Sequence, residues 1–233
     1  MNKVAIYKSD NYKYPRTFRP SEKYPEYRFE DISAEDNKVY HSVRECFRML
    51  GLDAERFGSP EWNPLGEYVN PGDNVLIKPN LVMDVNFNKQ GGTDCLYTNP
   101  SVVAVVIDYV VIALNGTGRI VVGDAPMQEC NFENLCTTSR YGDLIDYYKK
   151  KELDIAIQNK ISIGNTHNSF TRIQTMAHEC LHSIQDRKML IFNFIYSNIY
   201  ILYYLVTLIL LILKKLPNEM LFLNIFLILS FIY

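Results

Sequence analysis

Short apolar runs alternate with helix-like segments over the N-terminal part of the chain. Runs that are nearly all apolar and bounded by turn-forming residues indicate short buried strands; they occupy residues 4–7, 75–78 and 119–123. Segments that are apolar at helical spacing, or almost all round, follow these runs; they occupy residues 39–50, 102–114 and 141–153. This order predicts an α/β fold, in which a parallel sheet, incomplete within this chain, carries helices on its faces. We expect the second and third runs to pair as neighbouring parallel strands.

Local signals mark the ends of the expected helices. Ser33 has the character of an N-cap for the first helix, and Gly51 is expected to end that helix. Thr98 or Asn99 can cap the second helix, because Pro100 follows them at a position that suits a first helical residue.

Polar residues follow the expected strands, and they form the first candidate site. Lys78 and Asn80 follow the second apolar run, and Asp124 follows the third. Ligands of parallel α/β sheets bind beyond the carboxyl ends of the strands, and Thr98 lies at a helix start, where free N–H groups favour anions. These residues therefore predict a binding site for a small anion, with phosphate or a phosphorylated metabolite as the expected class. The alternative is that Lys78 is solvated and that Asn80 and Asp124 only close turns.

The C-terminal part of the chain is strongly apolar. Residues 190–213 carry no charge, and their length suits one crossing of a bilayer. Residues 220–233 are short for a second crossing, so we expect a transmembrane helical hairpin or a truncated span. We divide the chain accordingly into an α/β domain (1–155), a helical region (156–188) and membrane segments (189–233). The expected localisation is the cell membrane.

A metal-binding motif lies in the helical region. His178 and His182 are four residues apart, which places both imidazoles on one face of a helix. Such a pair can bind one zinc ion, and Glu179 beside them can take a proton from a metal-bound water. The alternative is that two histidines lie on a polar helix face and have no function.

With Ala177, Gln185 and the apolar segment that follows, this motif resembles the bacterial membrane-associated zinc metallopeptidases over residues 161–233. The resemblance implies that the two histidines are zinc ligands and that the glutamate is the general base. That family's third ligand lies further downstream, and His167 is the sterically easiest substitute here. Because a catalytic zinc normally needs three protein ligands, we expect an incomplete site with little or no peptidase activity.

A second set of motifs occurs in the α/β part, at residues 71–82, 98–100, 120–126 and 141–142. In this order they resemble the bacterial family called domain of unknown function 362, over residues 4–154. The resemblance implies an α/β fold with a cleft, but no reaction. Many members of that family carry iron–sulfur clusters through an added ferredoxin-like cysteine run. Cys130 and Cys136 are not part of such a run, so we expect no iron–sulfur cluster.

The net charge and the cysteines of the chain bear on its partners and on the compartment in which it folds. The net charge of −2 gives no sign of a nucleic-acid partner. The five cysteines include no Cys-x-x-Cys pair, which favours free thiols in a reducing compartment. Residues 1–8 are too short and polar for a signal peptide, so we expect the N-terminal domain to be cytoplasmic.

Three hypotheses about function remain open at this point. The first is a membrane-anchored protein with a zinc metallopeptidase motif. The second is a non-catalytic, membrane-tethered accessory protein whose α/β domain binds a small anion. The third is a non-functional fusion, since the two resemblances meet near residue 155 without a linker rich in Gly, Ser or Pro.

Overall fold

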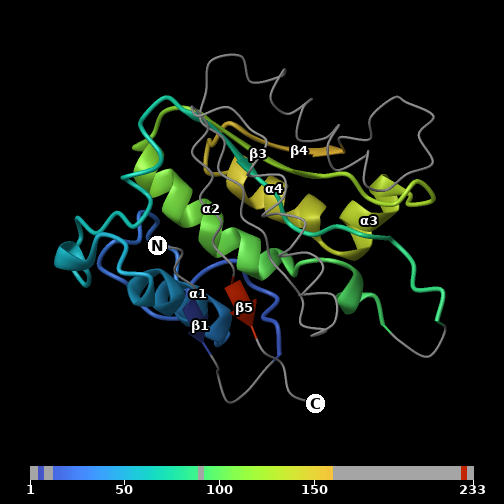
Figure 1. Ribbon diagram of the computed structural model, residues 1–233, viewed down its shortest axis with the longest axis horizontal. Coiled ribbons are helices and arrows are strands. Elements are labelled where there is room, and N and C mark those ends of the chain that lie inside the picture. The colour runs from blue at the N-terminus through green and yellow to red at the C-terminus, as the bar shows by residue number, and fades with distance from the viewer. Residues whose placement is uncertain (1–4, 8–12, 89–91, 160–226, 230–233) are drawn as a thin grey trace, which may run out of the picture.

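The structure is a computed structural model of the 233-residue chain, and it describes residues 5–7, 13–88, 92–159 and 227–229. Its elements are arranged in layers, with a sheet on one side, helices beneath it and the first helix of the chain beneath those (Figure 1). Strands thus alternate with helices, as the apolar pattern predicts.

Within the described residues, a three-stranded parallel sheet contains β2 (Asn74–Ile77), β3 (Arg119–Asp124) and β4 (Ile155–Asn159), in that order. Val75 lies opposite Ile120 in the register. The prediction that the second and third apolar runs are parallel neighbours is therefore confirmed. The sequence did not predict β4, whose first residue is the residue at which the α/β domain was expected to end.

The central helix α2 (Pro100–Leu114) is buried along its whole length. It lies beneath the sheet beside α4 (Tyr141–Lys149), and α1 (Lys38–Met49) packs on its other side (Figure 1). This position between two layers explains why α2 is apolar all round. A short helix that the sequence did not predict, α3 (Phe132–Thr138), precedes α4.

The helix ends follow local capping chemistry, with one correction. The N-cap of α1 is Asn37, whose side chain accepts a hydrogen bond from the Tyr40 N–H at 3.0 Å. Ser33 was the wrong residue for this role, because its hydroxyl accepts from the Glu35 N–H in the preceding turn instead. Gly51 does end the helix, in the left-handed region with φ of 74°.

The first apolar run forms β1 (Ala5–Tyr7), but this strand is not in the three-stranded sheet. It pairs in parallel with β5 (Leu227–Leu229) in a separate two-stranded sheet. Residues 227–229 are therefore a strand, and the expectation that residues 220–233 form a membrane helix is wrong for them. Among the residues that the structure describes, no helix has the length and apolar character needed to cross a membrane.

The N-terminal loop, residues 13–37, is fixed to the helices by a buried ion pair. Arg44 of α1 donates to both carboxylate oxygens of Glu26, at 2.6 and 3.3 Å. Tyr109 of α2 donates to the same carboxylate at 2.9 Å. A buried charge pair is tolerable when both partners are also hydrogen-bonded, so the loop is held as an integral part of the fold.

A second polar contact joins this loop to the C-terminal end of α4. Lys151 donates to Asp31 at 2.7 Å, and Tyr147 donates to the other oxygen of Asp31 at 3.0 Å. These bonds hold the pKa of Asp31 below its ordinary value, against the opposing effect of burial. The Lys151 ammonium also lies 4.1 Å from the ring centre of Phe29. Loop and helix are thus joined by both charge and aromatic contact.

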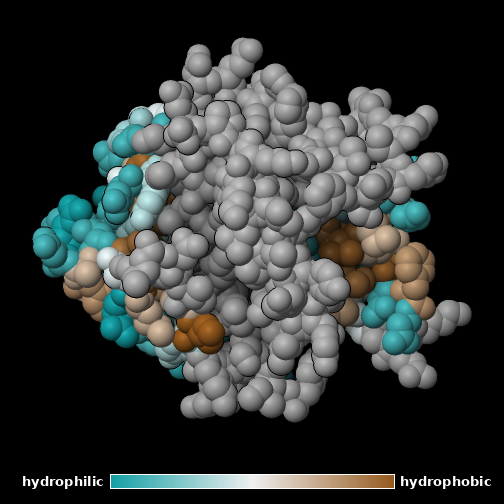
Figure 2. Space-filling model, in the orientation of Figure 1, coloured by the Kyte–Doolittle hydropathy of each residue, from teal (hydrophilic) through white to brown (hydrophobic). Residues whose placement is uncertain are grey.

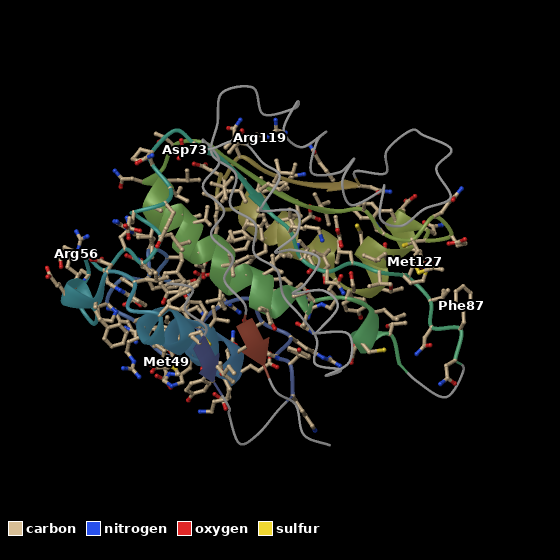
Figure 3. All side chains as sticks on the ribbon, in the orientation of Figure 1. Met49, Arg56, Asp73, Phe87, Arg119 and Met127 are labelled. Carbon is tan, nitrogen blue, oxygen red and sulfur yellow. The ribbon has the colours of Figure 1, made fainter. Side chains whose placement is uncertain are left out.

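Two short 3-10 helices complete the described elements, η1 (Ala54–Arg56) and η2 (Asp94–Leu96). Exposed apolar side chains lie near the loop that contains η2. Phe87 is 75% exposed and Met127 is 49% exposed, and Figure 3 places both at the right-hand side of the molecule. Figure 2 shows hydrophobic surface on that same side.

Candidate functional site at the carboxyl edge of the sheet

Lys78 and Asp124 form an ion pair at the carboxyl edge of the sheet. Lys78 directly follows β2, and Asp124 is the last residue of the neighbouring strand β3. The Lys78 Nζ lies 2.8 Å from Oδ1 of Asp124, with side-chain exposures of 20% and 7%. The parallel register places both strand ends at one edge, and the ion pair brings Lys78 and Asp124 together there. The expectation that Asn80 joins them on one concave surface stays a prediction.

The second oxygen of Asp124 has its own partner. The backbone N–H of Leu81 donates to Oδ2 of Asp124 at 2.6 Å. The carboxylate therefore holds the end of β3 against the loop that leaves β2. Because both oxygens are occupied in this way, Asp124 is fixed in position and directs the Lys78 ammonium.

Thr98 and Asn80 join the same loop to the start of α2. The Asn80 N–H donates to Oγ1 of Thr98 at 3.0 Å, and the Thr98 N–H donates to the Asn80 carbonyl at 2.8 Å. Tyr141, at the start of α4, donates its hydroxyl to the Thr98 carbonyl at 2.8 Å. Thr98 is buried and positions the edge, whereas Asn80 is exposed at it.

The N-terminus of α2 offers fewer free donors than the sequence suggested. Asn99 is the N-cap, and its side chain accepts from both the N–H and the hydroxyl of Ser101. Pro100 has no N–H, and the Val102 N–H bonds to the Asn99 carbonyl. The first turn is thus bonded internally, and the positive charge available at this edge comes from Lys78.

Asn159 is a further polar residue at this edge, and the sequence reasoning missed it. It ends β4 and lies opposite Asp124 in the register. Its side-chain oxygen is buried and has no hydrogen-bond partner. A buried acceptor without a partner is costly, and a ligand that carries a donor would satisfy it. Recognition of residues 155–159 as a strand would have revealed this residue.

Asp84 lies in the loop that follows β2, and its carboxylate accepts hydrogen bonds from two asparagines. Its Oδ2 accepts from the Asn134 side chain at 2.8 Å, and its Oδ1 accepts from the Asn131 N–H at 3.1 Å. These hydrogen bonds, that of Asn134 foremost, lower the pKa of Asp84. The loop after β2 is thereby joined to α3. The sequence did not indicate this role for Asp84, because Asn134, which binds it, lies 50 residues later in the chain. Without that contact, Asp84 is only an acidic residue in a polar loop.

Two cysteines lie near this loop. Burial raises the pKa of the Cys136 thiol to about 11, and it also raises the pKa of Cys130. Both thiols are free. A raised pKa disfavours the nucleophilic thiolate, so neither cysteine has the properties of a reactive thiol.

The predicted zinc site cannot be placed in the structure. His178, Glu179 and His182 lie outside the described residues, and so does His167. Within the described ranges, no group of His, Cys, Asp and Glu side chains is arranged to hold a metal ion. The zinc motif therefore remains a prediction.

The comparisons with known proteins bear on the α/β part. Residues 75–184 match the family model described as "Domain of unknown function (DUF362)". The resemblance noted in the N-terminal motifs is thereby supported from residue 75 onward, whereas residues 4–74 lie outside the match. No curated protein and no solved structure matches the chain, and the resemblance to zinc metallopeptidases has no support among these findings.

The extent of the DUF362 match is informative in itself. It starts within β2 and continues past the end of β4 to residue 184. Residues 178–182, which contain the histidine motif, therefore lie inside the matched region. The family's description names no activity, so any function must come from the site.

Proposed function

We propose that the α/β domain binds a small anion at the carboxyl edge of the sheet, with the ammonium of Lys78 as its positive charge. The observation that carries this proposal is the ion pair between Lys78 and Asp124, at 2.8 Å between adjacent strand ends. The edge of a parallel sheet beyond the strand ends is where such folds bind ligands.

The ammonium of Lys78 has capacity beyond its partner. An ammonium group has three N–H donors, and Oδ1 of Asp124 takes one of them. The lysine side chain remains 20% exposed, so an incoming anion can reach the other donors. Asp124 is itself held by the Leu81 N–H, and it therefore orients the ammonium before a ligand arrives, which lowers the entropic cost of binding.

Two asparagines at the carboxyl edge of the sheet indicate which other groups the ligand should carry. Asn80 is exposed and offers an amide that can donate to an oxyanion. The buried oxygen of Asn159 requires a donor. A phosphorylated metabolite that also carries a hydroxyl group fits both requirements, because its phosphate accepts and its hydroxyl donates.

The proposal places this domain on a membrane. Its support is the charge-free segment 190–213, whose length suits a bilayer crossing. The N-terminal domain is then cytoplasmic. The zinc-peptidase alternative has only the spacing of its motif as support, and no observation among the described residues favours it.

The test is a binding titration of the full-length protein with inorganic phosphate and with a panel of phosphorylated hydroxy-metabolites, followed by calorimetry. Lys78→Gln should weaken binding about tenfold or more, since it removes the charge while an amide can still donate to Asp124. Lys149→Met removes one positive charge from the exposed end of α4 and should leave the affinity unchanged. Equal affinities for the wild type and Lys78→Gln would refute the proposal.

A further inference from the structure

The loops that leave the carboxyl ends of β2 and β3 are joined to each other directly beside the candidate site. The Leu81 N–H donates to Oδ2 of Asp124 at 2.6 Å, and the Met127 N–H donates to the carbonyl of the next residue, Val82, at 2.9 Å. The other oxygen of the same carboxylate binds Lys78. A ligand on the Lys78 ammonium therefore lies next to both loops.

These two loops expose apolar side chains. Val85, Phe87 and Met127 are 42%, 75% and 49% exposed, and we call these three residues the apolar rim. They are three of the six large apolar side chains that are exposed among the described residues. Figure 3 shows Phe87 and Met127 on the side opposite Asp73 and Arg119, which mark the amino ends of β2 and β3. Single exposed apolar residues are ordinary, whereas their concentration beside a site indicates a ligand or a partner.

The loop that carries most of the rim is fixed by hydrogen bonds on both sides. Asp84 is bonded to α3 and to its N-cap, and the Asn86 side chain donates to the Gly92 carbonyl at 2.8 Å. Val85 lies between these two anchored residues, and Phe87 follows the second. The apolar side chains are thus presented before a ligand arrives, which lowers the entropic cost of binding.

We propose that the apolar rim binds the hydrocarbon part of an amphiphilic phosphate monoester whose phosphate group is held by Lys78. This inference rests on the proposed anion-binding function and names the class of its ligand. The rim begins four residues after Leu81, at most about 14 Å of extended chain, so a short hydrocarbon chain reaches it from the ammonium. Each methylene group that the rim removes from water strengthens binding.

The charges of these loops favour a single amphiphile over an anionic bilayer surface as the occupant. Among the described residues 79–88 and 124–138, every charged side chain is acidic, and Glu129 and Glu133 are exposed. Surfaces that bind anionic bilayers carry clusters of Lys and Arg, and acidic groups repel such bilayers. One bound phosphate requires only one cation, and Lys78 supplies it.

The first test compares two ligands on the full-length protein in phosphatidylcholine nanodiscs, with empty nanodiscs as the blank. Octyl phosphate should bind about tenfold more tightly than methyl phosphate, or better, because only the octyl chain reaches the rim. Equal affinities would overturn this inference and leave the proposed anion site standing. Binding of neither ligand would overturn both.

A matched set of variants locates the effect. Phe87→Ser combined with Met127→Ser should weaken octyl phosphate binding about fivefold or more and leave methyl phosphate binding unchanged. Met49→Ser is the control, because Met49 has the same 49% exposure as Met127 but lies on α1, away from the rim (Figure 3). Lys78→Gln should weaken binding of both ligands. Unchanged octyl phosphate binding in the rim variant or in Lys78→Gln would overturn the inference.

Photolabelling distinguishes the possible occupants of the rim. An octyl phosphate with a diazirine at the end of its chain should label a peptide that contains Phe87 or Met127. Excess methyl phosphate should prevent this labelling, because it competes for Lys78. Labelling that methyl phosphate does not prevent, labelling of the rim by a photoreactive nanodisc lipid instead, or a crosslink from the rim to a second copy of the chain would overturn the inference.

Discussion

Tyr148 donates a hydrogen bond of 2.7 Å to Asp108, and both side chains are buried between the sheet and the N-terminal loop. Burial raises the pKa of Asp108 to about 8, although the bond from Tyr148 partly opposes this shift. The carboxyl group is therefore protonated at neutral pH in the folded protein and ionised in the unfolded chain. Such a group stabilises the fold most at low pH, below its unfolded pKa.

The contribution of Asp108 to stability should be lost as the pH rises toward 8, because the folded state then binds more protons than the unfolded state. The slope from this one group is at most about 1.4 kcal/mol per pH unit. Asp108→Asn should be close to wild type in stability at acid pH, below the unfolded pKa of the carboxyl group, and more stable than the wild type at pH 8. Urea unfolding across this range measures the difference, and a variant that shows the same pH slope as the wild type would contradict the assignment.

The ion pair at the sheet edge should contribute to stability as well as to binding. Asp124→Asn removes the charge that compensates the half-buried Lys78, and we expect a loss of about 1–3 kcal/mol in unfolding free energy. Asp143→Asn is the control, because its pairing with Arg140 is exposed and exposed pairs contribute at most about 1 kcal/mol. Comparable losses in both variants would show that Asp124 has no special role.

Arg44 should tolerate neither truncation nor replacement by lysine. Its guanidinium group lies 4.4 Å from the ring centre of Phe57 and 5.1 Å from that of Trp62, while it also binds Glu26. Arg44→Lys loses the planar stacking and one of the paired bonds. Arg44→Met should cost about 3–5 kcal/mol by leaving Glu26 buried and unpaired.

A double-mutant cycle separates these effects at the buried pair. Arg44→Met combined with Glu26→Gln should recover a substantial part of the loss, because no charge then remains buried without a partner. Chemical denaturation of the four proteins measures the coupling. Strictly additive losses would mean that the pair does not act as a unit.

Asp84 gives a prediction at acid pH. Since the hydrogen bond from Asn134 is the main reason for its lowered pKa, Asn134→Ala should move that pKa up toward the ordinary range. The wild-type contribution is present above the unfolded pKa and is lost as the pH falls through the folded pKa. Carboxyl-detected NMR titration follows the group directly, and an unchanged Asp84 pKa in Asn134→Ala would disprove the cause assigned here.

Membrane attachment is a prediction from the sequence alone. A charge-free stretch such as residues 190–213 should hold the protein in the membrane fraction through high-salt and alkaline carbonate washes. Truncation after residue 189 should release the α/β domain into the soluble fraction. Full-length protein that stays monodisperse without detergent would refute the anchor.

The sequence was informative where one physical signal dominated locally. The strands β2 and β3 are nearly all apolar and end in turn residues, and α2 is apolar all round, so their positions were predicted closely. By contrast, β4 has only a short apolar start before Gln158 and Asn159, and α3 is short and polar. Short elements such as β4 and α3 depend on tertiary packing, and a pattern of apolar residues along the chain does not reveal that packing.

The candidate site, like the fold, was predicted from the sequence only in part. The rule that ligands bind beyond the carboxyl ends of parallel strands placed Lys78 and Asp124 at one site from the sequence alone. Asn159 depended on a strand that was missed, and the internal bonding of the α2 cap depended on the Asn99 side-chain conformation. Both are properties of arrangement in space, and single residues in a sequence do not show them.

The contacts of the N-terminal loop have a consequence for synthesis of the chain on the ribosome. Asp31 is bound by Lys151, which lies 120 residues later in the chain. At about 5–20 residues per second, translation needs on the order of ten seconds to reach Lys151 after Asp31 has been made. During that interval the loop's carboxylates and aromatic rings have no native partners from α4, so chaperones that bind nascent chains can reach them.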